Sequence, residues 1–323
     1  MQLTNEQIRS VTLGAAEIDF QDGFAVFYRM HRAQAERIAN FNADFGKKAY
    51  ATAGVRLDFY TDSEYFAFSY AVQAASSRTF YNLALYIDGK EYALVGENPA
   101  KNYQGEYQTR LPQGKKRVTL FLPCLFSAKL QNITLSDGAS ITPFVPKRRF
   151  VFHGDSITHG YDAISPAKAY ANQVAYALDA EIFNFAIGAA MLDTRMIDES
   201  TNFNADAVFV AYGTNDWAHR ISMQEFSAYC EAFFQTLARL HKDVPVFVIL
   251  PIWRSDCESE KPVGSFQAAK DEIRRIAEQY ANTQILDLAD DIPHELSLFT
   301  DGLHPNDIGF AHYTTGVLNK IKL

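Results

Sequence analysis

Serine, histidine and aspartate occur in two segments of the chain that could together carry out acyl transfer. Ser156 lies in the segment 153–160, and Asp301 and His304 lie in the segment 301–306. A serine hydroxyl is a weak nucleophile unless a neighbouring base takes its proton. Histidine can act as that base near neutral pH and then return the proton as an acid. An aspartate three residues before the histidine can fix its tautomer and stabilise the imidazolium. The sequence therefore predicts a Ser156–His304–Asp301 triad.

Two further segments could supply donors for the oxyanion of the tetrahedral intermediate. Gly188 lies in the run 187–190, and Asn215 lies in the run 212–216. The backbone N–H groups of Ser156 and Gly188 and the side-chain amide of Asn215 would supply three donors, each worth about 3–4 kcal/mol of barrier. Gly188 suits this role because it lacks a Cβ and allows a close approach.

The elements that must position these residues follow a strand–loop–helix rhythm from Phe150 onward. We expect helices near 166–178, 222–240, 266–281 and 307–321, and apolar strands at 150–152, 181–187, 207–211, 246–250 and 284–288. Such alternation predicts a parallel sheet with helices on both faces, a three-layer α/β domain. Ligands of these sheets bind beyond the carboxyl ends of the strands, where the polar segments follow.

Residues 1–145 show a different periodicity. Short runs alternate apolar and polar residues, and Asp88-Gly89 separates two of them as a hairpin turn would. This pattern predicts a β-sandwich, resembling a jelly roll, with a helix near residues 30–41. Two prolines and a basic run at 142–149 mark the junction, so we expect an accessory domain at 1–145 and a catalytic domain at 146–323.

The four polar segments, in this order, resemble those of the SGNH hydrolases, also called the GDSL esterase and lipase family. Ser156, Gly188, Asn215 and His304 match the four residues that name the family, and Asp301 matches its acid. The resemblance covers about residues 149–323. It implies a flavodoxin-like three-layer domain and ester hydrolysis without a metal or other cofactor. A preceding β-sandwich is similar to the arrangement in some carbohydrate esterases and acyl-transferring relatives.

Four other residues are candidates for the substrate pocket. Asp155 adjoins the serine and is expected mainly to shape its turn. Tyr161, Trp217 and Trp253 each follow a motif or a strand end and could form an apolar or sugar-stacking wall. His159 is expected to be a hydrogen-bonded loop residue.

Composition restricts the partners. The formal net charge is -8, which disfavours binding to nucleic acid. The three cysteines are widely spaced and show no metal-ligand spacing. Neither a signal peptide nor an apolar run long enough for a membrane span is evident, so we expect a cytoplasmic protein acting on a small-molecule ester. The oligomeric state is not indicated.

These observations predict a serine esterase that works through an acyl-serine intermediate. Short acyl groups, such as acetyl on a carbohydrate or another small molecule, are the expected substrates. An acyltransferase and a lysophospholipase or thioesterase would use the same triad, and both remain open. A binding module with a decayed site is the rival of another class, but every expected catalytic residue is present. For the β-sandwich, a structural role is favoured over carbohydrate binding.

Overall fold

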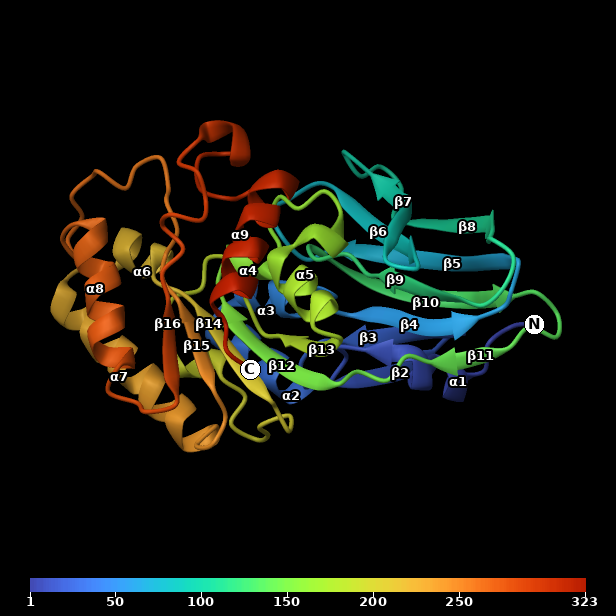
Figure 1. The fold of residues 1–323 in the computed structure, drawn as a ribbon, viewed down its shortest axis with the longest axis horizontal. Helices are drawn as coiled ribbons and strands as arrows, with labels where there is room; N and C mark the ends of the chain where they lie inside the picture. The colour runs from blue at the N-terminus through green and yellow to red at the C-terminus, as the bar shows by residue number, and fades with distance from the viewer. The chain divides into compact units, whose positions relative to one another are not determined.

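Antiparallel sheets form the first part of the chain and a parallel sheet forms the second (Figure 1). The computed structural model describes all residues from Met1 to Leu323. They group into two units, Met1–Pro146 with Ile164–Ala167, and Lys147–Ala163 with Lys168–Leu323. The division into an accessory domain at 1–145 and a catalytic domain at 146–323 stays a prediction.

The first unit contains two sheets whose strand pairings are all antiparallel. One has the order β1-β4-β9-β6-β7, with β11 also paired to β4, and the other has the order β2-β3-β10-β5-β8. The strands are β1 (Thr12–Leu13), β2 (Glu17–Gln21), β3 (Phe24–Tyr28), β4 (Arg56–Thr61), β5 (Tyr65–Ala74), β6 (Tyr81–Ile87), β7 (Lys90–Glu97), β8 (Gln104–Arg110), β9 (Lys116–Phe121), β10 (Phe126–Leu135) and β11 (Ile141–Pro143).

The two sheets pack face to face, which confirms the predicted β-sandwich. Phe59 of β4 and Phe66 of β5 belong to different sheets, and both are fully buried. Their ring centroids lie 6.2 Å apart. The predicted hairpin joins β6 to β7, with Asp88 at φ 48° and Gly89 at φ 79°. Positive φ at both central residues is typical of a type I′ turn, whose twist matches that of the strands.

Three helices accompany these sheets. α2 (Arg32–Phe41) confirms the expected helix, whereas α1 (Asn5–Val11) and α3 (Ala43–Ala49) were not predicted. α1 begins with a capping box, in which the Thr4 hydroxyl accepts the N–H of Gln7 and the Gln7 side chain accepts the N–H of Thr4. The two missed helices are seven residues long, so neither contains the two full turns that would reveal an apolar face.

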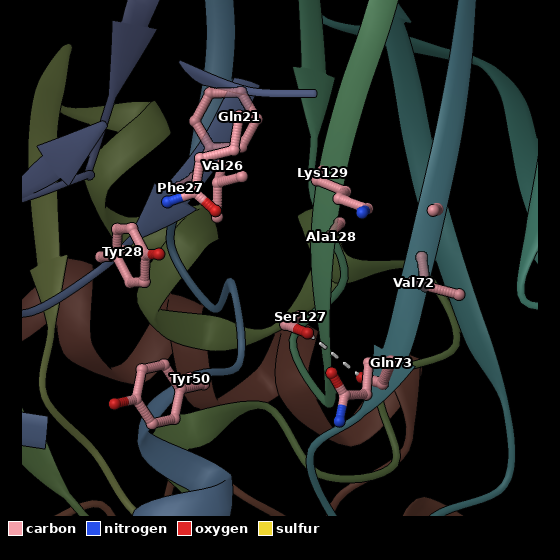
Figure 2. A pocket seen from close by; sticks show the side chains of 11 residues that line it. Gln21, Val26, Phe27, Tyr28, Tyr50, Val72, Gln73, Ser127, Ala128 and Lys129 are labelled. Atoms are coloured by element: carbon pink, nitrogen blue, oxygen red, sulfur yellow. Dashed lines mark hydrogen bonds between the residues drawn. The ribbon is translucent and has the colours of Figure 1, made fainter. Parts of the chain in front are cut away.

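The second sheet of the first unit carries a hollow of about 590 Å³ on the face opposite the buried one (Figure 2). Tyr28, Tyr50 and Lys129 line it, and so do Gln73 and Ser127, which are joined by a hydrogen bond of 3.5 Å. None of the four polar segments contributes to this hollow. It therefore offers none of the groups predicted for acyl transfer.

The second unit is built on five parallel strands in the order β13-β12-β14-β15-β16. Counted along this unit the order is 2-1-3-4-5, which is the flavodoxin-like form of the doubly wound fold. The strands are β12 (Arg148–Gly154), β13 (Ala180–Asn184), β14 (Ala207–Ala211), β15 (Val246–Ile249) and β16 (Thr283–Leu286).

Helices form a layer on each face of this sheet, which confirms the three-layer architecture (Figure 1). α5 (Tyr170–Ala177) packs against α9 (Asp307–Lys320), and α7 (Met223–Leu240) packs against α8 (Phe266–Ala277). Every residue of β13 and β15 is buried, as expected for strands covered on both faces.

Several predicted bounds differ from the structure, among them the helix at 266–281, which ends at Ala277, and two of the differences have a local cause. β13 ends at Asn184 rather than Ile187, because the Asn184 side chain accepts the N–H of Ala186 and donates to the carbonyl of Thr158. These side-chain bonds hold the turn that begins here, while the N–H groups of Phe185 and Ile187 still donate to the carbonyls of Phe152 and Gly154 in β12. The predicted helix at 166–178 is split into a 3₁₀ turn at Pro166–Lys168 and α5, because Ala169 between them is extended.

Candidate active site

Ser156, His304 and Asp301 are in hydrogen-bonding contact. The Nε2 atom of His304 lies 2.7 Å from the Oγ atom of Ser156. The Nδ1 atom of the same ring lies 2.8 Å from Oδ2 of Asp301. Each ring nitrogen thus faces the partner that a base between a nucleophile and an orienting carboxylate requires. The three residues that we predicted as a triad are brought together.

The short helix α4 (Ser156–His159) presents the serine directly after β12. At its start, Oδ1 of Asp155 accepts the N–H of Ile157 at 3.0 Å, which satisfies one otherwise unpaired donor of the first turn. At its end, Gly160 has φ 97°, and the N–H of Tyr161 bonds to the carbonyl of Ser156 at 3.0 Å. This closing bond is characteristic of a Schellman motif. The helix is therefore a single turn held at both ends.

Hydrogen bonds hold Asp301 in its charged form. Its Oδ1 atom accepts the N–H groups of Leu303 and His304 at 3.1 and 2.9 Å, while Oδ2 faces the imidazole. Burial acts to raise the pKa of Asp301, but the bonds from His304 and Leu303 and the charge of His304 lower it to about 2. The carboxylate is ionised over the whole range in which a histidine base works.

Gly188 lies in a tight turn whose ends, Ile187 and Ala190, are joined by a backbone hydrogen bond of 3.0 Å. Its N–H, which we predicted as an oxyanion donor, donates to Nδ1 of His159 at 3.2 Å. This contact confirms that His159 is a hydrogen-bonded residue. It also shows that the Gly188 N–H has a partner before any substrate binds.

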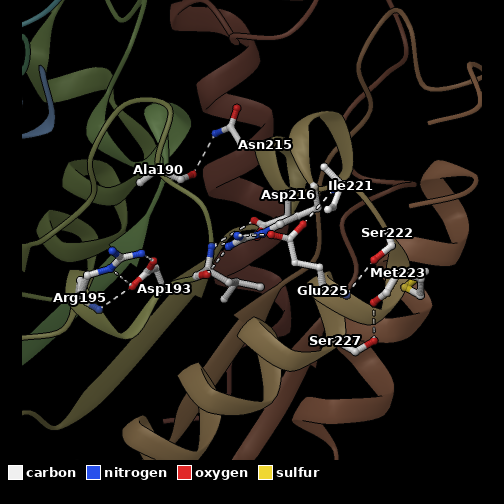
Figure 3. A network of polar contacts seen from close by, with 12 residues as sticks. Ala190, Asp193, Arg195, Asn215, Asp216, Ile221, Ser222, Met223, Glu225 and Ser227 are labelled. Atoms are coloured by element: carbon white, nitrogen blue, oxygen red, sulfur yellow. Dashed lines mark hydrogen bonds and ion pairs between the residues drawn. The ribbon is translucent and has the colours of Figure 1, made fainter. Parts of the chain in front are cut away.

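Asn215 lies in the first turn of α6 (Thr214–His219), directly after β14. Its Nδ2 atom donates to the carbonyl of Ala190 at 3.1 Å (Figure 3). A primary amide carries two N–H groups, so this bond orients the side chain and leaves a second donor. Through Ala190 the amide is tied to the turn that contains Gly188.

Tyr161 lies between the Gly188 turn and His304, the predicted base. Its ring stacks on that of His304 with centroids 5.6 Å apart, and it meets the ring of His159 edge-on at 5.6 Å. A Cβ on Gly188 would lie only 2.5 Å from the Tyr161 oxygen. Tyr161 is 4% exposed. It therefore supports the predicted site from within rather than forming an open wall.

The two tryptophans have different surroundings. Trp217 is fully buried, packs on Phe266 and donates its ring N–H to the carbonyl of Gly264 at 3.0 Å. This burial removes Trp217 from the candidate pocket residues. Trp253 is half-buried and packs against Phe299, just before Asp301 in the chain, so it remains a candidate.

Asp155 belongs to a buried pair of carboxyl groups with Asp216 rather than to an open pocket. Burial raises the pKa of Asp155 to about 7, and the charge of Asp216 adds to this effect. Burial also raises the pKa of Asp216, to about 6, although Arg220 and the N–H of Leu192 oppose it. Asp216 has these favourable partners at 3.4 and 3.1 Å, so its pKa is raised less than that of Asp155.

Asp162 is a residue at the site that the sequence analysis missed. Its Oδ2 atom lies 3.7 Å from Nδ1 of His304, and its side chain is 5% exposed. Asp162, Asp301 and His304 offer three potential metal-ligand atoms within 4.8 Å of one another. A metal there would compete with the His304–Asp301 hydrogen bond. The only signal in the sequence is an acid two residues after the glycine that ends α4.

Comparison with known proteins identifies the family. Residues 152–312 match the GDSL-like lipase/acylhydrolase family. No curated protein sequence matches the chain. None of the helices combines the length and hydrophobicity that a membrane span requires.

Several solved structures share the fold. The salicylyl-acyltransferase SsfX3 of a tetracycline biosynthetic pathway superimposes with a TM-score of 0.83 at 21% identity, covering 96% of this chain and 93% of its own. A GDSL-like lipase from Bacteroides ovatus gives 0.75 at 19% identity, covering 96% and 94%. A carbohydrate esterase family 2 enzyme with a carbohydrate-binding domain, from Corynascus thermopiles (Myceliophthora fergusii), gives 0.64 at 20% identity, covering 83% and 93%.

The family match spans the polar segments around Ser156, Gly188, Asn215 and His304, and the structural likenesses extend over the preceding sandwich. The chain is therefore an enzyme that acts on ester bonds and belongs to the GDSL-like lipase/acylhydrolase family, the SGNH hydrolases.

Proposed function

We propose that Ser156 is the nucleophile of this enzyme, with His304 as its base and Asp301 as the orienting acid. The observation that carries the proposal is the pair of contacts on one imidazole, 2.7 Å to the serine oxygen and 2.8 Å to the carboxylate. Because Asp301 accepts from Nδ1, Nε2 is left to take the proton of the serine hydroxyl.

The reaction then runs in two halves. The Ser156 oxygen forms a bond to the ester carbonyl carbon while its proton moves to Nε2 of His304. The carbonyl electron pair becomes an oxyanion. When the tetrahedral intermediate collapses, the bond to the alcohol breaks, and His304 protonates the departing oxygen. Water attacks the acyl-serine with the same base, and the acid and free serine are released.

We propose that the oxyanion is bound by the N–H groups of Ser156 and Gly188 and by the amide of Asn215. Asn215 is already oriented by Ala190 and retains a second N–H. The Gly188 N–H must exchange or share its bond to His159 to take part. We therefore expect the Asn215 amide to contribute more to oxyanion binding than the Gly188 N–H does.

The favoured substrates are esters of short acyl groups, such as acetyl on a carbohydrate or another small molecule. The small residues Gly188, Ala189 and Ala190 follow β13, and the buried Tyr161 ring fills the space beside Gly188. Family 2 carbohydrate esterases share the fold and the preceding sandwich. A lysophospholipase or thioesterase would need an extended apolar groove beside Ser156. A series of esters with acyl chains of increasing length distinguishes these activities from a short-acyl esterase.

Acyl transfer to an alcohol is a second candidate function. The similarity to a salicylyl-acyltransferase extends over 96% of the chain, sandwich included. Both functions share the acyl-serine and differ in the group that accepts the acyl. Partition of products between water and an added alcohol separates them, because an acyltransferase yields mainly the new ester at modest alcohol concentrations.

Labelling by a fluorophosphonate probe tests the nucleophile. The wild-type protein should be labelled covalently and should hydrolyse p-nitrophenyl acetate, and Ser156→Ala should lose both properties. Ser297→Ala changes an exposed serine of the same unit and serves as the control. Retention of labelling in Ser156→Ala would refute the assignment. In a series of p-nitrophenyl esters, preference for octanoyl or longer chains would exclude the short-acyl proposal.

A further inference from the structure

We propose that Asp162 is a second carboxylate partner of the His304 imidazole, a positioning residue that stabilises the imidazolium and can replace Asp301. This inference rests on the proposed role of His304 as the base. It concerns a residue outside the four segments that define the family, and it predicts that the triad's acid is partly redundant.

The geometry places both carboxylates on the same ring nitrogen. Oδ2 of Asp301 lies 2.8 Å from Nδ1 of His304, and Oδ2 of Asp162 lies 3.7 Å from it. Asp301 therefore holds the hydrogen bond, while the Asp162 oxygen is about 1 Å farther from the same nitrogen, just outside hydrogen-bonding distance. A small movement of either side chain would bring Asp162 into hydrogen-bonding distance.

The chain places Asp162 there by two successive reversals. Gly160 ends α4 with φ 97°, and Asp162 itself has φ 67°. The N–H of Ala163 bonds back to the carbonyl of Gly160 at 3.3 Å. Aspartate enters the left-handed region more readily than most residues, so the backbone requirement and the carboxylate coincide at this position. The turn aims its side chain at the base of the triad.

Burial makes the Asp162 carboxylate effective although it is the more distant of the two. The Asp301 side chain is 43% exposed, whereas that of Asp162 is 5% exposed. Water screens an exposed charge, and a buried charge acts through a medium of lower effective dielectric. When His304 takes the serine proton, Asp162 therefore contributes to the imidazolium despite its longer distance.

The groups placed against the imidazole come from three directions. Ser156 faces Nε2, the ring of Tyr161 stacks on one face, and Asp162 and Asp301 face Nδ1. Of these groups two are carboxylates and none is a cation. Removing one carboxylate therefore leaves the other to hold the Nδ1 proton, and removing both takes away the two carboxylates that face Nδ1.

A double-mutant cycle tests the inference on the full chain. Asp162→Asn, Asp301→Asn and the double variant are compared in kcat/KM for p-nitrophenyl acetate between acidic and alkaline pH. We expect Asp162→Asn to lower the plateau about tenfold and to move the acid limb about one unit toward lower pH, because the protonated base loses an anionic neighbour. The double variant should lose more than the product of the two single losses, since each carboxylate compensates for the other.

Two controls separate positioning from structure. Asp179→Asn alters another aspartate of the same unit that also has positive φ, 51°, and pairs with Lys147 rather than His304. It should leave the pH profile unchanged. Asp162→Glu retains a carboxylate and should keep the acid limb near its wild-type position. If Asp162→Asn fails to fold, Asp162→Ser, which also lacks the carboxylate, takes its place, and the same shift of the acid limb is expected.

An acid limb that Asp162→Asn leaves unmoved, with losses that multiply independently in the double variant, would overturn the inference. That outcome leaves the proposed function intact provided that Ser156→Ala is inactive. If Ser156→Ala retains full activity and labelling, the proposed function fails instead, whatever the Asp162 variants show.

Discussion

Adding one methyl group at Gly188 tests how closely the predicted oxyanion turn is packed against the base. A Cβ at this position would lie 2.5 Å from the oxygen of Tyr161 and 2.6 Å from its Cε2 and Cζ atoms. Gly188 is not among the residues with positive φ, so its backbone accepts alanine. The effect of Gly188→Ala is therefore the collision with a ring that is 4% exposed.

The collision must displace the Tyr161 ring, which stacks on His304. An ordinary contact between carbon atoms requires about 3.5–4.0 Å, so the ring must shift by about 1 Å. Overpacking of a buried site costs about 1–3 kcal/mol of stability. Displacing a catalytic group by about 1 Å lowers the rate about 100-fold, equivalent to about 2.7 kcal/mol of barrier. We expect kcat to fall by that factor.

The assay combines kcat for p-nitrophenyl acetate with thermal unfolding, and Tyr161 variants supply the decisive comparison. In the Gly188→Ala background, Tyr161→Phe removes the oxygen but keeps the Cε2 and Cζ atoms, so it should restore little. Tyr161→Ala removes the ring and should recover stability relative to its own single variant. Wild-type kcat and stability in Gly188→Ala would refute the reasoning, as would full rescue by Tyr161→Phe.

Three further predictions concern neighbouring residues. Asp155→Asn keeps a capping oxygen but cannot ionise. The pKa of the wild-type aspartate is raised to about 7, so its protonated form stabilises the fold at low pH and this stability is lost as pH rises from about 4 through 7. The Tm of Asp155→Asn should therefore exceed that of the wild type by more at pH 8 than at pH 5. Asn215→Ala should lower kcat about 10²–10³-fold with an unchanged KM, measured with the same ester. Ala189 has φ 69° in its turn, so Ala189→Gly should raise the free energy of unfolding in urea by about 0.5–1 kcal/mol, and a loss would contradict the strain at this position.

The fold of the second unit could be predicted because its signals are local and its topology is restricted. β14 was predicted with its observed bounds, since a run of five apolar residues lies between Asp206 and the pair Tyr212-Gly213. β13, β12 and β14 are neighbours in the sheet, so the segments that follow them meet at one edge. The topology of a parallel sheet therefore predicts which distant residues meet, and this prediction needs no knowledge of side-chain contacts.

Contacts that depend on a single turn could not be predicted in this way. Asp162 reaches His304 only because Gly160 and Asp162 both adopt positive φ, and neither angle is encoded in a periodic pattern. Trp217 was misplaced for the opposite reason. It follows Asn215 closely in sequence, but in the helix α6 it points into the unit, where Phe266 covers it. Proximity in sequence to a functional residue therefore says little about which way a helical side chain faces.

The short helix after β12 has more than one task in this arrangement. Its first residue is the proposed nucleophile, and its last, His159, accepts the N–H of Gly188. The residues that follow its closing glycine are Tyr161, which stacks on the base, and Asp162, which faces Nδ1 of His304. One capped turn thus holds the proposed nucleophile, the predicted oxyanion turn and the proposed base in a fixed arrangement. A change in this turn should therefore disturb all three groups together, whereas a change in Asp301 should disturb the base alone.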